Sequence, residues 1–231
     1  MVTDRPYLII SDLQIPFEAP RALEFCVYIK RHYGIPDTNV INVGDEVDNL
    51  HGGLYPKDPD GHHTPNSEIG AAKEKIHQWG DAFPYMMLCE SNHGIRWMKK
   101  ASAAEIPSQM MRAYQDVLQT PPGWHWRKEW RFPTLKHPFR VIHGCGYSGM
   151  NGHRTAAMDG GISTAIGHLH SHPGIARIVT SGQKIWGMNT GCLIDVDAYA
   201  FKYNSNSRFK PGLGVGVVFN QGSMPMWIPY E

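Results

Sequence analysis

Five short polar motifs, each placed at or just after a short apolar run, constrain the fold of this chain more than any other feature. The apolar runs cover residues 7–10, 40–43, 85–89, 141–142 and 162–166, and such runs predict buried strands. Side chains that follow neighbouring strands of a sheet meet at one edge, where α/β proteins bind ligands. Carboxylate, amide and imidazole groups, which divalent metals prefer, are therefore expected to converge there. The motifs are, in chain order, Asp12-Leu13-Gln14, Gly44-Asp45-Glu46-Val47-Asp48, Ser91-Asn92-His93-Gly94, His143-Gly144 and Gly167-His168-Leu169-His170.

The order of these motifs resembles that of calcineurin-like metallophosphoesterases, particularly compact members that bacterial viruses often encode. The signature of that family runs D-x-H, GD-x-x-D, GNH-[D/E], H and GH-x-H, and the similarity spans residues 12–170. The chain departs from the signature in two motifs. Gln14 occupies the position of a family histidine, and the third motif has Ser91 for the leading Gly and Gly94 for the trailing acid.

The resemblance implies a centre of two divalent metal ions that share one carboxylate, Asp45. A carboxylate suits this role because it has two oxygens and because its charge offsets the repulsion between the ions. A water between the ions would ionise near neutral pH and attack phosphorus in line as metal-bound hydroxide. Carried over residue by residue, the first ion would be held by Asp12, Gln14, Asp45 and His170, and the second by Asp45, Asn92, His143 and His168.

The same resemblance makes His93 the catalytic histidine beside the bridging Asp45. In the family this histidine contacts the phosphate and is suited to protonate the leaving oxygen, because imidazole titrates near neutrality. The family often has an acid directly after it, where this chain has Gly94. Asp48 is the candidate to orient His93 instead, and the alternative is that no such partner exists.

Three further residues are candidate substrate contacts. Arg96 is close enough in sequence to His93 to reach a phosphate as a charged donor, and the alternative is a solvated helix residue. His51 and Asp58 lie in the polar segment that follows the second motif. That segment, 49–65, is rich in Gly, Pro and Asp and predicts a long loop that shapes a substrate entrance.

Gln14 is the departure with the largest chemical consequence. An amide oxygen is a harder and weaker ligand than imidazole, so the first position is expected to bind metal less tightly and to prefer manganese over zinc. Manganese is therefore the favoured cofactor for the pair, with zinc, nickel, iron and magnesium as alternatives. The opposing interpretation is that Gln14 binds no metal and that water fills its place.

Length and composition predict one metallophosphoesterase domain over residues 1–231. The chain is 42% apolar but has no apolar run long enough to span a membrane. The N-terminus lacks a basic-then-apolar signal, so we expect a cytoplasmic protein, in the host cytoplasm if a virus encodes it. The four cysteines show no C-x-x-C spacing, which favours core thiols over disulfides or a structural zinc site.

Local patterns predict alternating strands and helices followed by strand-rich sequence. Helices are expected over 21–33, 67–83 and 95–118, the last with a break at Pro107, and strands recur after residue 174. Residues 124–132 alternate aromatic and charged side chains, which predicts a half-buried strand; the alternative is a base-stacking surface for single strands. These patterns alone indicate mixed α and β structure, and the resemblance implies a four-layer α/β/β/α sandwich of two mixed sheets flanked by helices.

The function that these observations favour is metal-dependent hydrolysis of phosphodiester bonds, by a nuclease or a nucleotide phosphodiesterase. A phosphomonoesterase acting on a small substrate and a non-catalytic binding module of the same fold are the alternatives. The net charge of +1 gives no global attraction for polyanions, so DNA, RNA and nucleotides all remain admissible partners. Asn49-Leu50 follows Asp48 where protein phosphatases have Arg-Gly, which argues against that class. A monomer or a homodimer is expected, without membrane partners.

Overall fold

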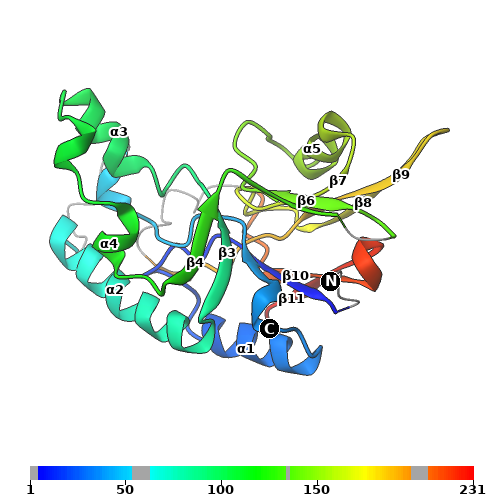
Figure 1. Cartoon of the computed structure of the whole chain (residues 1–231), viewed down its shortest axis with the longest axis horizontal. Coiled ribbons are helices and arrows are strands. Elements are labelled where there is room, and N and C mark those ends of the chain that lie inside the picture. The colour runs from blue at the N-terminus through cyan, green and yellow to red at the C-terminus, as the bar shows by residue number, and fades with distance from the viewer. Residues whose placement is uncertain (1–4, 54–62, 134–135, 199–207) are drawn as a thin grey trace.

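The computed structural model describes residues 5–53, 63–133, 136–198 and 208–231, and it contains two packed β-sheets (Figure 1). Six strands form the first sheet and five form the second. The first sheet has the spatial order β11 (Met224–Pro229), β10 (Gly214–Phe219), β1 (Tyr7–Ile10), β2 (Val40–Asn42), β3 (Tyr85–Cys89) and β4 (Gly123–Arg127). The second has the order β5 (Glu129–Phe132), β6 (Phe139–Ile142), β7 (Ser163–Ile166), β9 (Lys184–Asn189) and β8 (Gly174–Val179).

Both sheets are mixed. In the first, β1 to β4 run parallel, while β10 pairs antiparallel with the free side of β1 and β11 pairs antiparallel with β10. In the second, β6, β7 and β9 run parallel, and β5 and β8 close the edges antiparallel. The motif-bearing strands β1, β2, β3, β6 and β7 therefore all lie in the parallel parts of the two sheets, where their carboxyl ends meet.

Helices cover the outer faces of the sheets. The helices α1 (Ala22–His32) and α2 (Pro65–Ala82) lie below the first sheet, and α5 (Gly152–Gly160) lies above the second (Figure 1). On α1, Ala22, Cys26 and Ile29 are buried at helical spacing, as an amphipathic helix on a sheet requires. The predicted arrangement of two mixed sheets flanked by helices is thus confirmed.

Two large apolar clusters hold these layers together. One lies between the first sheet and its helices and includes Leu8, Ile76 and Trp79. The other lies between the two sheets and includes Ile41 and Trp186. Alternate residues of β1 serve the two clusters, because successive side chains of a strand point to opposite faces.

The predicted helices are present with adjusted ends. The first is α1, and α2 begins at Pro65, because Thr64 caps it and exchanges hydrogen bonds with Ser67. The predicted third helix is divided into α3 (Arg96–Ala103), the 3₁₀ turn η3 (Ser108–Met110) and α4 (Tyr114–Leu118). Pro107 lies directly before η3, which confirms the expected break.

The described parts of the segment after the second motif fit the expected loop. The segment contains a 3₁₀ turn, η2 (Leu50–Gly52), and ends where α2 begins. Two further 3₁₀ turns, η1 (Asp37–Asn39) and η5 (Asn220–Gly222), lie next to β2 and β10. Asp58, a candidate substrate contact, lies outside the described residues.

The alternating stretch 124–132 is two strands in different sheets, and the prediction of one strand is wrong in this respect. Lys128 separates β4 from β5 at the point where the chain crosses between the sheets. The aromatic side chains do point inward as predicted, with Trp124 in the helix-side cluster and Trp130 packed against the intersheet cluster. Their indole N–H groups donate to the carbonyls of Phe83 and Leu88, at 2.8 Å each, so these rings are core residues and not a stacking surface.

All four cysteines are free thiols, and the prediction of core thiols is confirmed for three of them but is wrong for Cys145. Cys26, Cys89 and Cys192 are fully buried, whereas Cys145 is exposed. Among the described residues, no helix is both long enough and apolar enough to cross a membrane.

Candidate metal centre

The motifs meet because the loops that follow their strands are hydrogen-bonded to one another. The backbone N–H groups of Asp12 and Gln14 donate to the carbonyls of Gly44 and Asp45, at 3.1 and 2.9 Å. The N–H of His168, in the loop that follows β7 of the second sheet, donates to Asp12 Oδ2 at 2.9 Å. The site therefore spans both sheets and is fixed largely by main-chain contacts.

Four of the candidate ligands have left-handed backbone conformations. The φ angles are 47° for Asp12, 49° for Gln14, 52° for Asp45 and 66° for His168. Non-glycine residues in this region carry a cost of order 1 kcal/mol or more, and such residues cluster at functional sites. Packing holds these four side chains toward a common centre against their backbone preference.

Two glycines leave room for the cluster. Gly44 has φ of 110°, and a Cβ there would lie 2.7 Å from His143 Nδ1. A Cβ on Gly167 would overlap Ser11 Oγ and Asp12 Oδ2 and lie 2.8 Å from Val43 Cγ2. A side chain at either position would displace a candidate ligand.

Asp12, Gln14 and His170 form the first group of candidate ligands. His170 Nε2 lies 3.2 Å from Asp12 Oδ1 and 3.2 Å from Gln14 Nε2. Gln14 Oε1 is buried without a hydrogen-bond partner, and an unpartnered buried acceptor is costly unless a cation or water satisfies it. This orphan oxygen fits a metal ion, and the hard oxygen donors of Asp12 and Gln14 suit manganese or magnesium.

Asp45, Asn92, His143 and His168 form the second group. His143 Nε2 lies 3.3 Å from Asp45 Oδ2 and 2.8 Å from Asn92 Oδ1. The rings of His143 and His168 are 5.1 Å apart between centroids. One ligand atom from each of Asp12, Asp45 and His143 lies within 4.8 Å of the other two, so Asp45 is close to a member of each group.

The Val43 carbonyl orients the ring of His143. Its oxygen can only accept, so His143 Nδ1 donates to it at 2.9 Å, and Nε2 is the nitrogen left to face the cluster. Such a contact fixes ring orientation and tautomer at metal sites. A main-chain acceptor gives no signal in the sequence, so this contact was not predictable.

Opposite charges lie close together in the metal-free cluster. Burial alone would lower the pKa of His143, but the Asp45 carboxylate outweighs burial and raises this pKa to about 9. Burial would raise the pKa of Asp45, but His143 and His93 hold it well below its usual range. Burial and then His143 lower the pKa of His168, which favours the neutral imidazole that binds metals. In the metal-free protein a proton on His143 thus takes the place of a cation.

We expect the affinity of the metal-free protein for a divalent ion to rise about tenfold per pH unit toward pH ~9 and then to level off. Below a pH of about 9 the ion must displace the His143 proton, because the folded protein raises this pKa above the ordinary value of 6.5. The same proton stabilises the metal-free fold fully below pH 6.5, and this contribution is lost as the pH rises through about 9. Manganese titrations followed by electron paramagnetic resonance at several pH values measure the slope.

The matched variant for this measurement is His143→Gln, which keeps a side chain of similar reach but cannot take up the proton. Its affinity should be lower and its pH slope shallower. A wild-type affinity that does not change with pH would contradict the expectation.

His93, Asp48 and Arg96 form a connected group beside the cluster. His93 Nδ1 lies 2.8 Å from the Asp48 carbonyl oxygen and 2.9 Å from Asp48 Oδ1, both of which accept its proton. Arg96 Nη2 donates to His93 Nε2 at 2.7 Å, and Nη1 donates to the Asp48 carbonyl at 2.7 Å. The structure therefore supplies Asp48 as the partner that orients His93. His93 Nε2 is 3.6 Å from Asp45 Oδ2, so this group adjoins the second ligand group.

His51 is hydrogen-bonded to a carboxylate of α2. Its Nδ1 lies 2.6 Å from Glu68 Oε2, and the backbone N–H groups of Leu50 and His51 donate to the same carboxylate. Glu68 of α2 therefore anchors η2, a role that the sequence did not indicate. A substrate contact by His51 stays a prediction.

Asn49 is a contributor that the sequence analysis missed. It has φ of 51°, and its side-chain amide donates to the His93 carbonyl at 3.0 Å. Asn tolerates left-handed backbone better than most residues, which would have been the available signal.

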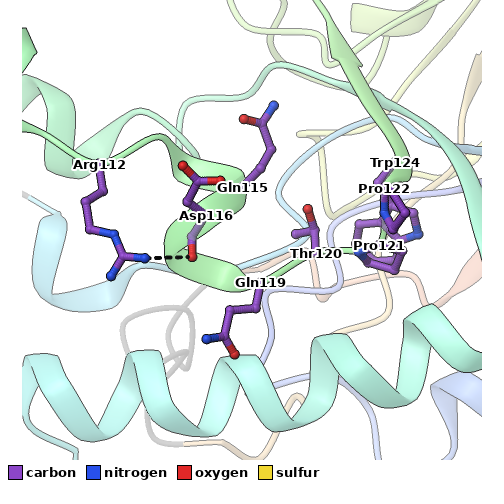
Figure 2. Close-up of a pocket in the computed structure, with 8 residues that line it drawn as sticks. All are labelled: Arg112, Gln115, Asp116, Gln119, Thr120, Pro121, Pro122 and Trp124. Atoms are coloured by element: carbon purple, nitrogen blue, oxygen red, sulfur yellow. Dashed lines mark hydrogen bonds between the residues drawn. The ribbon is translucent and has the colours of Figure 1, made fainter.

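A separate surface hollow of about 540 Å³ lies between α4 and the start of β4 (Figure 2). Arg112 donates there to the Asp116 carbonyl at 3.5 Å. The hollow does not contain any of the candidate ligands and does not compete with the cluster as a catalytic site. Its lining residues are Arg112, Gln115, Asp116, Gln119, Thr120, Pro121, Pro122 and Trp124.

Comparison with known proteins gives similarity to solved structures alone, since no protein family and no curated protein matches the sequence. A novel archaeal phosphodiesterase matches over 97% of this chain and 99% of its own, with 11% identity and a TM-score of 0.47. Vps29 of Chaetomium thermophilum matches over 94% and 83%, with 10% identity and a TM-score of 0.42. TT1561 of Thermus thermophilus matches over 98% and 99%, with 10% identity and a TM-score of 0.41. Similarities at this level do not identify an activity, which depends on the side chains of the cluster.

Proposed function

We propose that this chain is a divalent-metal-dependent phosphoesterase that hydrolyses phosphodiester bonds of a nucleic acid or nucleotide, in one catalytic domain over residues 1–231. The observation that carries the proposal is the meeting of two ligand groups at one buried carboxylate, Asp45. The motif resemblance to calcineurin-like metallophosphoesterases supports the same activity. A binding module would not need this ligand set together with an oriented histidine beside it.

The ligand groups would hold two ions of different preference. Asp12, Gln14 and His170 would hold the first, Asn92, His143 and His168 the second, and Asp45 would bind both. Two such ions, when bound, supply a water of lowered pKa and neutralise the phosphoryl oxygens. The protein's part is to fix the ligands, which the left-handed backbone and the glycine contacts do before any substrate arrives.

His93 and Arg96 would act on the phosphoryl group. Because Asp48 holds His93 Nδ1, the other nitrogen faces the cluster and would pass a proton taken up from solvent to the leaving oxygen. Arg96 now donates to that nitrogen, and its guanidinium would turn to a phosphoryl oxygen when substrate binds. Once the Arg96 guanidinium has turned away, His93 Nε2 is free to carry the proton for the leaving oxygen. The single positive charge of Arg96 suits the single charge of a diester better than the double charge of a monoester.

The proposal is tested by hydrolysis of bis-p-nitrophenyl phosphate and of p-nitrophenyl phosphate. Metal-stripped protein would be resupplied separately with manganese, nickel, zinc or magnesium. Metal-dependent cleavage of the diester supports the proposal and leads to assays on single-stranded and duplex DNA and on RNA. Cleavage of the monoester alone, or no cleavage by protein that has bound metal, contradicts it.

The metal preference of the first position is tested by Gln14→His. The variant should bind zinc at this position at least about tenfold more tightly than the wild type does. Even the loss of residues that only support metal ligands changes metal affinity by about 10–100-fold. Histidine is also tolerated in left-handed backbone, so the φ of 49° should not prevent folding. Competition with a chromophoric chelator measures the zinc and manganese affinities.

The matched control is Gln183→His, which adds a histidine at an exposed position in the turn between β8 and β9. It should leave both affinities unchanged. Equal and tight zinc occupancy of both positions in the wild-type protein would overturn the assignment of a weaker, manganese-preferring first position.

A further inference from the structure

We infer, on the basis of the proposed metal-dependent function, that Cys145 is a thiolate ligand of the second metal position. It would join His143 and His168 there. The other three cysteines, Cys26, Cys89 and Cys192, are buried in the apolar clusters. The centre would then combine a hard first position with a softer second one.

The geometry of three side chains carries the inference. One ligand atom from each of His143, Cys145 and His168 lies within 4.8 Å of the other two. A zinc ion with four or five bonds of roughly 2.0–2.3 Å holds adjacent ligand atoms about 3–3.6 Å apart. The three groups therefore need to close by at most about 2 Å to share one ion.

Asn92 marks the point on which these groups converge. Its Oδ1 accepts from Cys145 Sγ at 3.3 Å and lies 2.8 Å from His143 Nε2. A sulfur, an imidazole nitrogen and an amide oxygen thus already surround one small volume. Without an ion they satisfy one another by hydrogen bonds, and with an ion all three present lone pairs to it.

The backbone after β6 brings the thiol to this place. Gly144 and Gly146 flank Cys145 with φ of 108° and 95°, and the Tyr147 N–H donates to the Gly144 carbonyl at 3.1 Å. A Cβ on Gly144 would lie 3.2 Å from the Gly167 carbonyl, so a larger residue would push this loop away from the fifth motif. The tight turn keeps Cys145 beside both His143 and His168.

The chemical consequence is a difference in metal selectivity between the two positions. On binding, the Cys145 S–H bond is replaced by a sulfur–metal bond, and the proton leaves to solvent without change of oxidation state. Thiolate favours zinc, iron(II) or cobalt(II) over magnesium and manganese, whereas Asp12 and Gln14 favour the harder ions. We therefore expect a mixed-metal centre when both kinds of ion are supplied.

The test is the absorption spectrum of the cobalt(II)-loaded full chain. A cobalt–thiolate bond gives a sulfur-to-metal charge-transfer band in the near ultraviolet that imidazole and carboxylate ligands do not give. The wild-type protein should show this band, and Cys145→Ala should lose it. Ser148→Ala, a change at an exposed residue of the same loop, should keep it. Since Cys145 is exposed, its replacement by alanine should not disturb folding, which an unfolding curve verifies.

A second measurement uses thiol reactivity and needs no cobalt. Native metal-free protein should react with iodoacetamide at one thiol, because the other three cysteines are buried. Saturating zinc should suppress that reaction by about tenfold or more, as expected when a thiolate is bound to metal.

The outcomes separate this inference from the proposed function. Cobalt that binds without a charge-transfer band, or a band that persists in Cys145→Ala, overturns the thiolate ligand and leaves the metal centre intact. Wild-type protein that binds no cobalt overturns both.

Discussion

Asp45→Asn should lower metal-dependent diester hydrolysis by about 10³-fold or more. The substitution preserves shape but removes the charge that offsets two cations and one of the oxygens that would bind them. Loss of a residue that only supports a ligand already costs 10–100-fold, so loss of the shared ligand should cost more. Asparagine is the suitable replacement because it tolerates the left-handed backbone of Asp45, with φ of 52°. Steady-state rates at saturating manganese, together with bound-metal stoichiometry, measure the effect.

The matched control is Asp159→Asn, which removes the same charge from an exposed position at the end of α5. Its rate should equal that of the wild type within a factor of about two, as for surface substitutions generally. The pKa of His143 should also fall in Asp45→Asn, because the carboxylate that raises it is gone. Retention of wild-type activity by Asp45→Asn would remove this residue from the centre of the mechanism.

Gly167→Ala should destabilise the protein by about 3 kcal/mol, at the upper end of the usual cost of overpacking. The added methyl group would overlap Ser11 Oγ and Asp12 Oδ2, both of which are buried and hydrogen-bonded to each other. Asp12 must move to relieve the overlap, so metal affinity at the first position should fall about tenfold or more. Urea unfolding of the metal-free protein and manganese titration of the folded protein measure the two effects separately.

Gly182→Ala controls for the loss of a glycine as such. A Cβ at Gly182 meets no atom within 4 Å, and neither glycine has a positive φ, so the comparison isolates the steric effect at Gly167. The control should change stability by less than about 0.5 kcal/mol. If the two variants were equally stable and bound manganese equally well, the packing of Asp12 against Gly167 would not hold the site.

The convergence of the candidate ligands was predictable because it depends on strand position. The apolar runs at 7–10 and 85–89 coincide with β1 and β3, and polar residues directly after parallel strands gather at one edge. The interactions that orient the ligands were not predictable. The Val43 carbonyl beside His143 and the Asp48 carbonyl beside His93 come from main-chain atoms, whose direction depends on tertiary structure.

The alternation over 124–132 shows the limit of periodicity more clearly. A period of two residues predicts that Trp124 and Trp130 point inward, and both do. The period carries no information on which sheet each strand joins, because strand pairing depends on contacts between residues that are distant in the sequence. The crossing at Lys128 between β4 and β5 therefore had no signal beyond the break in alternation.

Gln14 illustrates a site where sequence reasoning left two interpretations open. Substitution of the family histidine suggested either a weaker ligand or none. In the structure Gln14 Oε1 is buried without a hydrogen-bond partner, and Gln14 Nε2 lies 3.2 Å from His170 Nε2, so the amide group adjoins a candidate ligand. The unpartnered oxygen supports the proposal that Gln14 binds metal, and the sequence does not specify the direction of that amide group.

The hydrogen bond from the His168 N–H to Asp12 Oδ2 joins a loop of the second sheet to a loop of the first. Ions bound at the cluster would join the same two loops, since Asp12 and Asp45 follow strands of one sheet and His143 and His168 follow strands of the other. Bound metal would then link the two sheets reversibly. At a free metal concentration 100 times the dissociation constant, this binding adds about 2.7 kcal/mol to the free energy of unfolding. The metal supply of the cell would thus affect the fraction of the protein that is folded, as well as the proposed catalytic rate.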